Sequence, residues 1–452
     1  MKSSFAAIFR GFAPFLVSAQ KHKLSLPVCP VSSIINPIAM KFLVIFLFAS
    51  FSFVFFNFAD QAPALTSIYN VINLKNYLGG IFFVASTSEE YLKNKFVGAR
   101  NGGEPIKILV VPGHDSASVG AQFKNVKEAD LTAELGKYLA EFLGENKKFE
   151  AVISRTEDGY SPEFSSYFEK ERSSIQDFMK TYRLYMKTAV DGGLVDSNQI
   201  VEHNEASLNG AIRLYGINKW ANENGVDLVI HIHFNDYPGH PASRPGKYSG
   251  FAIYVPEKQY SNSQASVAIA QKISNRFNAY STPSDMPQES SGIVEEQELI
   301  AVGSNNSLNP AGMLIEYDYI YEPQFLSPET RQATLKELAF QTYSGIKDFF
   351  ENNSTGTAKF SETTLLPHQW NGDMEEGLVG NLDVLSLQAS LVSEGDYPAQ
   401  GFTKNNCPIT GSFKKCTVAA VKEFQKKYGL EQTGYAGPQT RNLLNEKYSS
   451  QQ

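Results

Sequence analysis

Cysteine, tryptophan and excess positive charge are scarce in this 452-residue chain. It has three cysteines and two tryptophans, and its 40 Lys and Arg are outnumbered by 47 Asp and Glu, giving a formal charge of -7. Three cysteines exclude a disulfide scaffold for the whole chain, although Cys407 and Cys416 could close a small loop in an oxidising compartment. The mild acidity gives no general attraction for phosphate backbones, and no Gly-rich phosphate loop or basic stripe appears. We therefore expect no nucleic-acid partner.

Hydrophobic and aromatic residues are present in ordinary amounts. The chain is 42% hydrophobic, 12% aromatic and 19% charged, which is close to globular averages. Wholesale disorder, collagen-like repeats and a polytopic membrane protein are thereby excluded. At roughly 150 residues per domain, the length predicts about three units.

One long uncharged run, residues 42–59, lies near the N-terminus. As a helix, its 18 residues would almost span a hydrocarbon layer about 30 Å thick. The basic region 1–41 contains Lys and Arg but no Asp or Glu, so the positive-inside rule directs everything after residue 60 out of the cytoplasm. Because Met40-Lys41 resembles a translation start, part of 1–41 could be over-annotated. Export is predicted, with 42–59 as a retained transmembrane anchor, which we favour, or a cleaved signal segment.

Changes in composition divide the exported part into segments. A stalk (60–105) precedes a large domain (106–351) that carries an insertion at about 161–205, and a polar linker (352–379) leads to a compact helical module (380–450). Strand signals alternate with helix signals in the large domain. They predict strands near 106–111, 149–154, 226–233, 250–255 and 313–317 and helices near 129–143, 212–222, 263–277 and 328–350. This alternation predicts an α/β fold, layered, with helices on a mostly parallel or mixed central sheet.

Three of the seven histidines lie where chemistry is expected. His114 follows a buried strand, and His231 and His233 lie on another. Because the carboxyl ends of strands face the ligand crevice in open α/β sheets, His114 and His233 are predicted to converge there, with His231 on the same face one pleat deeper. Glu128, at the start of a helix, would complete two imidazoles and one carboxylate, a usual set of ligands for catalytic zinc. The alternative is that each is a structural residue, with Glu128 complementing the helix dipole.

Glu316 is a further candidate. It directly follows the apolar residues Met313-Leu-Ile315 at the end of a predicted central strand. A carboxylate there is costly unless it is paired or functional, so it is either part of a buried ion pair or a catalytic group.

Six ordered segments of the large domain resemble zinc N-acetylmuramoyl-L-alanine amidases. They are Ile108-Leu-Val-Val-Pro-Gly-His-Asp115, Lys127-Glu-Ala-Asp130, Ser154-Arg-Thr-Glu-Asp158, His231-Ile-His-Phe-Asn235, Gly250-Phe-Ala-Ile-Tyr254 and Met313-Leu-Ile-Glu316. The resemblance covers about 107–350. By position, it implies that His114, Glu128 and His233 bind zinc (Zn2+) and that Glu316 is the catalytic carboxylate.

The chain departs from the family pattern at three places. Asp115 stands where the family usually has Gly, and His231 stands where it usually has Ser. Tyr317-Asp-Tyr319 follows the glutamate, where a small residue, Gly and Phe are usual. We interpret Asp115 and His231 either as groups that orient a metal ligand or as neutral drift.

The C-terminal module, at about 380–448, resembles a peptidoglycan-binding domain of the three-helix type. The landmarks are Leu382-Asp-Val-Leu-Ser-Leu-Gln388, Gly411-Ser-Phe413, Thr417-Val-Ala-Ala-Val421, Phe424-Gln425, Gly429-Leu430 and Gly434-Tyr-Ala-Gly437 through Thr440. This resemblance implies a small all-α domain that binds the cell wall.

Together, the two resemblances imply a hydrolase of the amide bond between N-acetylmuramic acid and L-alanine in peptidoglycan. A zinc peptidase acting on stem peptides and a catalytically silent wall-binding protein are the alternatives. Some relatives carry a helix near the insertion (161–205) that covers the zinc until an activator protein displaces it, so autoinhibition and an activator partner are hypotheses here. Glu202, His203 and Glu205 could reach a metal from this segment. We expect an extracytoplasmic protein in contact with the membrane through 42–59.

Overall fold

A computed structural model describes residues 87–193, 196, 206–237, 239–241, 243–302, 309–351 and 362–449. Regions 1–41 and 42–59 lie outside these residues, as do 197–205 of the insertion. Among the helices that are described, none combines the length and hydrophobicity needed to cross a bilayer.

A six-stranded mixed sheet forms the centre of the large domain. Its order is β4-β1-β7-β10-β8-β9, and every neighbouring pair is parallel except β10 with β8. The strands are β1 (Ile106–Pro112), β4 (Phe149–Ile153), β7 (Leu228–Asn235), β8 (Ala252–Pro256), β9 (Ile293–Glu296) and β10 (Ala311–Tyr319). Strands β1, β7 and β10 are almost wholly buried, as expected for apolar strands covered on both faces.

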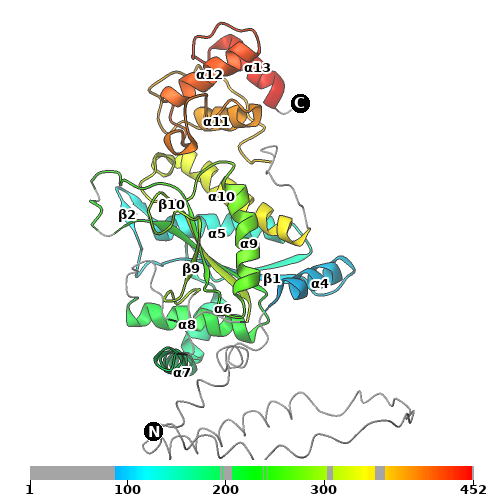
Figure 1. The fold of residues 1–452 in the computed structure, drawn as a ribbon, viewed down its shortest axis with the longest axis vertical. Helices are drawn as coiled ribbons and strands as arrows, with labels where there is room; N and C mark the ends of the chain where they lie inside the picture. Colours follow the sequence, from blue (N-terminus) through cyan, green and yellow to red (C-terminus); the bar gives the residue numbers. More distant parts are fainter. Residues whose placement is uncertain are drawn as a thin grey trace, which may run out of the picture. The chain divides into compact units, whose positions relative to one another are not determined.

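Helices cover both faces of this sheet, as Figure 1 shows. On one face, α5, α9 and α10 pack over Ile108, Ile230 and Ile315. On the other, α6 and α8 enclose a second cluster with Leu109, Val229 and Trp220, and α7 packs against α8. The helices are α5 (Glu128–Gly144), α6 (Pro162–Lys170), α7 (Arg172–Asp191), α8 (Leu208–Glu223), α9 (Ser263–Phe277) and α10 (Pro328–Phe350). The mixed α/β layered fold predicted from sequence is confirmed.

Part of the segment predicted as a stalk (60–105) is instead a helix of the large domain. Helix α4 (Glu89–Arg100) buries Leu92 and Phe96 completely in the main core. Its apolar positions are only four residues apart and are surrounded by charge, so the sequence pattern was too short to predict a packed helix.

Short elements connect these layers. They are the hairpin β2–β3 (Gln122–Phe123, Val126–Lys127), the hairpin β5–β6 (Arg155–Thr156, Gly159–Tyr160) and the 3-10 turns η3 (Pro323–Phe325) and η4 (Lys404–Asn406). The hairpin β2–β3 lies between β1 and α5, and β5 follows β4 directly. Both hairpins therefore lie near the carboxyl end of β1.

The C-terminal domain contains three helices, as predicted: α11 (Leu382–Glu394), α12 (Lys415–Lys427) and α13 (Pro438–Tyr448). Cys407 and Cys416 form a disulfide with a Cα–Cα distance of 5.8 Å. Trp370 and Met374, from the segment predicted as a linker (352–379), are buried in this domain's core. The domain's packing therefore begins before residue 380.

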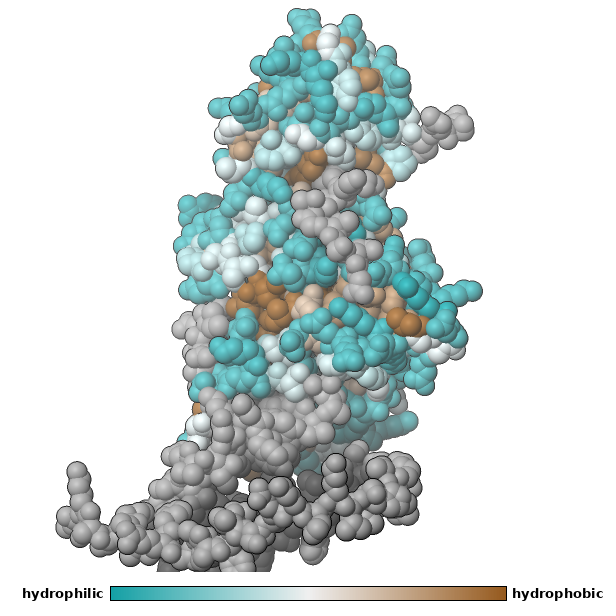
Figure 2. Space-filling model, turned by 45° about the vertical axis from the view of Figure 1, so that its right-hand side comes forward, coloured by the Kyte–Doolittle hydropathy of each residue, from teal (hydrophilic) through white to brown (hydrophobic). Residues whose placement is uncertain are grey.

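Polar side chains dominate the described surface. Few large hydrophobic residues are more than a third exposed there: Tyr91, Val97, Leu184, Leu208, Val379 and Leu382. The face in Figure 2 is accordingly mostly hydrophilic, with apolar residues in small patches.

Candidate metal centre

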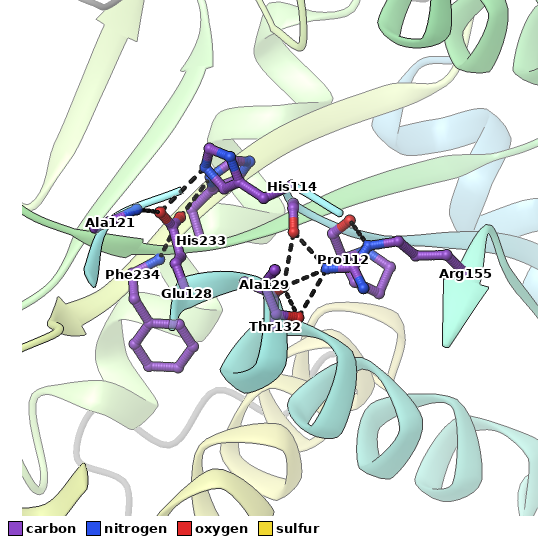
Figure 3. Close-up of polar contacts among 10 residues, drawn as sticks. Pro112, His114, Ala121, Glu128, Ala129, Thr132, Arg155, His233 and Phe234 are labelled. Atoms are coloured by element: carbon purple, nitrogen blue, oxygen red, sulfur yellow. Dashed lines mark hydrogen bonds and ion pairs between the residues drawn. The ribbon is translucent and has the colours of Figure 1, made fainter. Parts of the chain in front are cut away.

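The predicted ligands meet at the carboxyl edge of the sheet. His114 follows β1, His233 lies near the end of β7, and Glu128 is the first residue of α5 (Figure 3). His114 Nε2 lies 3.1 Å from Glu128 Oε2, and His233 Nδ1 lies 2.9 Å from Glu128 Oε1. One ligand atom from each residue falls within 4.8 Å of the others. Three residues from distant parts of the chain are thus brought within reach of one ion.

Close approach of the backbone makes this arrangement possible. A Cβ atom on Gly113 would lie 2.4 Å from the His233 ring, and one on Gly120 would lie 2.3 Å from the Glu128 carboxylate. Gly120 also has a φ of 72°, which disfavours any side chain. His114 itself has a φ of 62°. Such a backbone conformation is costly for a histidine and persists only where the surroundings enforce it, which is common at functional sites.

Glu128 is held by groups other than the histidines. Its Oε2 accepts a hydrogen bond from the Ala121 N–H (2.8 Å), and its Oε1 accepts one from the Phe234 N–H (3.2 Å). These donors come from the residue directly before β2 and from β7, so the carboxylate is oriented from two sides. Its position at the N-terminus of α5 also favours negative charge.

The three groups influence one another's proton affinity. Burial opposes ionisation of Glu128, but the two histidines outweigh burial and hold the pKa of this carboxyl well below its usual range. Burial disfavours protonation of His114, yet the Glu128 charge outweighs it and raises the His114 pKa. At His233 burial prevails and lowers the pKa. An ionised carboxylate beside a neutral imidazole is the state in which such groups bind a metal.

Glu316 lies beside this cluster on β10, where it pairs in register with His233 of β7. Its Oε2 is buried and has no hydrogen-bond partner within the described structure. Burial, followed by the charges of Glu128 and Glu289, raises the Glu316 pKa well above its ordinary value. Among the described residues Glu316 forms no ion pair, so the buried ion pair considered from sequence is not found in that part of the chain.

Two of the three departures from the family pattern, Asp115 and His231, form no hydrogen bond with the predicted ligands among the described residues. Asp115 forms an ion pair with Arg213 of α8 and accepts hydrogen bonds from the N–H groups of Ala117 and Ser118. His231 is only 1% exposed, and neither ring nitrogen has a partner among the described residues. Burial, reinforced by His233, lowers the pKa of His231 to about 3.

Two buried residues of the site were not predicted from sequence. Arg155 was noticed only as part of a motif, yet its side chain bonds to the segments that carry His114 and Glu128. Glu289 accepts hydrogen bonds from Asn235, Tyr254 and Tyr319. It lies in a turn-rich stretch with no periodicity, so no sequence signal could have identified it. Glu202, His203 and Glu205 lie outside the described residues.

Comparison with known proteins gives two family matches. The N-acetylmuramoyl-L-alanine amidase family model matches residues 108–348, which is more than half of the chain. The peptidoglycan binding domain model matches residues 381–444.

Individual relatives are more distant. The chain is 38% identical to the zinc D-Ala-D-Ala carboxypeptidase of Streptomyces albus G over 77 residues, 17% of this chain and 28% of that protein. It thus spans less than a third of that relative's length. An N-acetylmuramoyl-L-alanine amidase from Clostridium difficile 630 has 18% identity and a TM-score of 0.34, covering 56% of this chain and 99% of the other. The CwlD amidase of Clostridioides difficile, in complex with the GerS lipoprotein, has 16% identity and a TM-score of 0.35, covering 54% and 98%.

The family match includes all or most of each strand of the sheet and every predicted site residue, from His114 to Glu316. The chain therefore belongs to the N-acetylmuramoyl-L-alanine amidase family and also carries a peptidoglycan binding domain.

Proposed function

We propose that His114, Glu128 and His233 bind a zinc ion and that Glu316 is the catalytic base for hydrolysis of the bond between N-acetylmuramic acid and L-alanine. The observation that carries this proposal is the meeting of three ligand atoms within 4.8 Å, beside a carboxylate with an unpartnered oxygen.

The donor set suits zinc. Two imidazoles and one carboxylate are usual for catalytic zinc, which keeps a fourth position open for water or substrate. Oriented donors behind a ligand, such as the Ala121 and Phe234 N–H groups on Glu128, strengthen metal binding. His114 and His233 remain partly exposed, with side-chain exposures of 28% and 18%, so substrate can approach from solvent.

Proton transfer is the task of Glu316. When bound, zinc supplies a Lewis acid that polarises the scissile carbonyl and makes water more acidic. Glu316 takes a proton from the attacking water and delivers it to the leaving amine of L-alanine. Its raised pKa suits the first step, because a carboxyl group with higher proton affinity is a stronger base, and it keeps the proton on Glu316 until the amine leaves. Such transfer typically contributes about 10²- to 10⁴-fold in rate.

The remaining parts of the chain serve location and control. The C-terminal domain holds the enzyme on the polymer and raises the local concentration of substrate. The chain acts outside the cytoplasm, with 42–59 as its membrane anchor or export signal. Some relatives carry a helix in this region that covers the zinc, so we also propose that the insertion (161–205) blocks the site until an activator protein displaces it. Deletion of 161–202 tests this block. Lower or unchanged activity in a folded deletion variant would count against a block.

The main test combines metal analysis with product analysis. Purified wild-type protein and Glu316→Gln are compared for zinc content and for products released from peptidoglycan, identified by mass spectrometry. We expect about one zinc per chain in both, with free stem peptides and peptide-free glycans from the wild type only. Glu337→Gln, which alters a buried carboxylate on α10, is the control and should remain active. Shortened peptides still attached to sugar would indicate a peptidase, and no hydrolysis by zinc-loaded wild type would indicate a silent protein.

A further inference from the structure

Arg155 is a buried cation directly behind the candidate metal centre. It begins β5, and it is only 3% exposed. Figure 3 shows its side chain extending toward the end of β1 and the first turn of α5. These are the two segments that present His114 and Glu128.

The guanidinium joins these two segments through hydrogen bonds. Its Nε donates to the Pro112 carbonyl (3.1 Å), and its Nη2 lies within bonding distance of the carbonyls of Gly113 (2.5 Å) and Ala129 (2.9 Å). Nη2 also donates to the Thr132 hydroxyl (2.8 Å), which in turn donates to the Gly113 carbonyl (2.8 Å). The bonded peptide groups thus lie immediately before His114 and immediately after Glu128.

These partners are unusual for a buried arginine. Each hydrogen-bond acceptor found for Arg155 in the described structure is a carbonyl or hydroxyl oxygen, whereas the partly buried Arg276 on α9 forms a two-pronged ion pair with Asp348. A planar fork of donors can bind several carbonyls in fixed directions at once, which a lysine ammonium cannot do as rigidly.

The backbone at this point needs support. His114 has a φ of 62°, and the Gly113 carbonyl that precedes it is bonded by both Arg155 and Thr132. A strained residue keeps its conformation only where its neighbours fix it. Arg155 supplies that restraint on one ligand while it also holds the helix turn of the other.

We propose that Arg155 is a positioning residue that sets the separation of His114 and Glu128 and thereby strengthens metal binding. This inference rests on the proposed zinc site. It assigns to Arg155 no contact with metal or substrate.

The test measures zinc affinity separately from folding. Metal-free full-length protein is prepared as wild type, Arg155→Met and Arg155→Lys, and the zinc dissociation constant is measured by competition with a chromogenic chelator. We expect Arg155→Met to bind zinc about 10- to 100-fold more weakly, the range typical for loss of a group that orients metal ligands. The zinc affinity of Arg155→Lys should lie between those of the wild type and Arg155→Met, because lysine keeps the charge but forms only some of the hydrogen bonds.

A matched control separates positioning from general stability. Arg276→Met removes a partly buried guanidinium that is paired with Asp348, and it should lower the melting temperature without changing zinc affinity. Should Arg155→Met fail to fold, Thr132→Val removes the bridging hydroxyl while leaving Arg155, and we expect about three-fold weaker zinc binding, with Thr132→Ser restoring it. Wild-type zinc affinity in folded Arg155→Met, or in Thr132→Val if that variant is used, would overturn the inference. Failure of the wild type itself to bind zinc would instead overturn the proposed function.

Discussion

The two sides of the proposed catalytic site are held in opposite ways. On the ligand side, backbone donors hold the Glu128 carboxylate and backbone carbonyls hold the Arg155 guanidinium. On the base side, Glu316 Oε2 is buried without a partner in the described structure, as are both ring nitrogens of His231 on β7. Metal ligands gain affinity from being fixed in advance, whereas a base gains proton affinity from poor solvation. The site therefore combines a rigid half with a reactive half.

The largest expected effect is on the rigid half. Gly113→Ala places a Cβ where the His233 ring lies, so the ring must move and the ligand set is broken. We expect loss of zinc and at least about a 10³-fold loss of activity, because misplacement by 1 Å can already cost about 10²-fold. Zinc content and turnover of peptidoglycan measure this.

Gly144→Ala is the matched control for that experiment. A Cβ on this residue, at the end of α5, has no neighbour within 4 Å, so zinc binding and activity should remain. A fully active, zinc-loaded Gly113→Ala protein would refute the view that the ligand side tolerates no displacement.

The reactive half should respond through pH. Glu289 is 1% exposed, and its charge contributes to the raised pKa of Glu316. Glu289→Gln removes that charge, so the Glu316 pKa falls and the acidic limb of the kcat/KM profile moves to lower pH. On that limb we expect activity, relative to the optimum, to rise roughly two- to ten-fold, as for a carboxylate charge acting at an effective dielectric of about 20.

The wild type and Glu289→Gln are both loaded with zinc, so the metal changes the Glu316 pKa by the same amount in each protein. Glu296→Gln, at a buried glutamate of β9, should leave the limb in place. A limb that moves upward with Glu289→Gln would contradict the assignment of Glu316 as the base.

The free energy of unfolding gives a third test of the difference between the ligand side and the base side. A carboxyl whose pKa is higher in the folded state than its ordinary 4.5 destabilises the fold once pH rises above that value. Glu316→Gln should therefore raise the free energy of unfolding of the metal-free protein at pH 7 by roughly 0.5 to 2 kcal/mol. The gain should shrink toward pH 4, which urea unfolding at both pH values can measure. An equal gain at pH 4 would mean that packing, not ionisation, is responsible.

The smallest effect is expected at His231. Its pKa of about 3 is below the ordinary 6.5, so the neutral ring costs stability increasingly as pH falls below 6.5. His231→Leu removes two unpartnered nitrogens and should stabilise the protein by about 1 kcal/mol at pH 7, and by more at pH 5. Zinc affinity should stay unchanged. Weaker zinc binding would show that His231 supports His233 after all.

The central strands and the convergence of His114 and His233 could be predicted from the sequence, and the physical reasons are clear. Apolar β-branched runs such as β1 specify buried strands, and the carboxyl ends of parallel strands share an edge, so His114 and His233 had to lie near each other. The helices α9 and α10 were predicted with their observed bounds because their apolar residues recur at helical spacing.

The supporting residues were beyond prediction because their partners are distant along the chain. Glu289 meets Asn235 and Tyr254 only once the sheet has formed, and the antiparallel placement of β8 beside β10 has no local signature. Arg155 bonds mainly to backbone carbonyls, which every residue possesses and no sequence pattern distinguishes.

Helix α4 has a practical consequence for anyone dissecting this enzyme. Its Leu92 and Phe96 are fully enclosed, with the Phe96 ring stacked against Phe149 and Phe350. A fragment that begins at residue 106 lacks Phe96, so the rings of Phe149 and Phe350 would be exposed to water. An exposed aromatic patch promotes self-association. A soluble, monomeric catalytic fragment should therefore begin no later than Thr87.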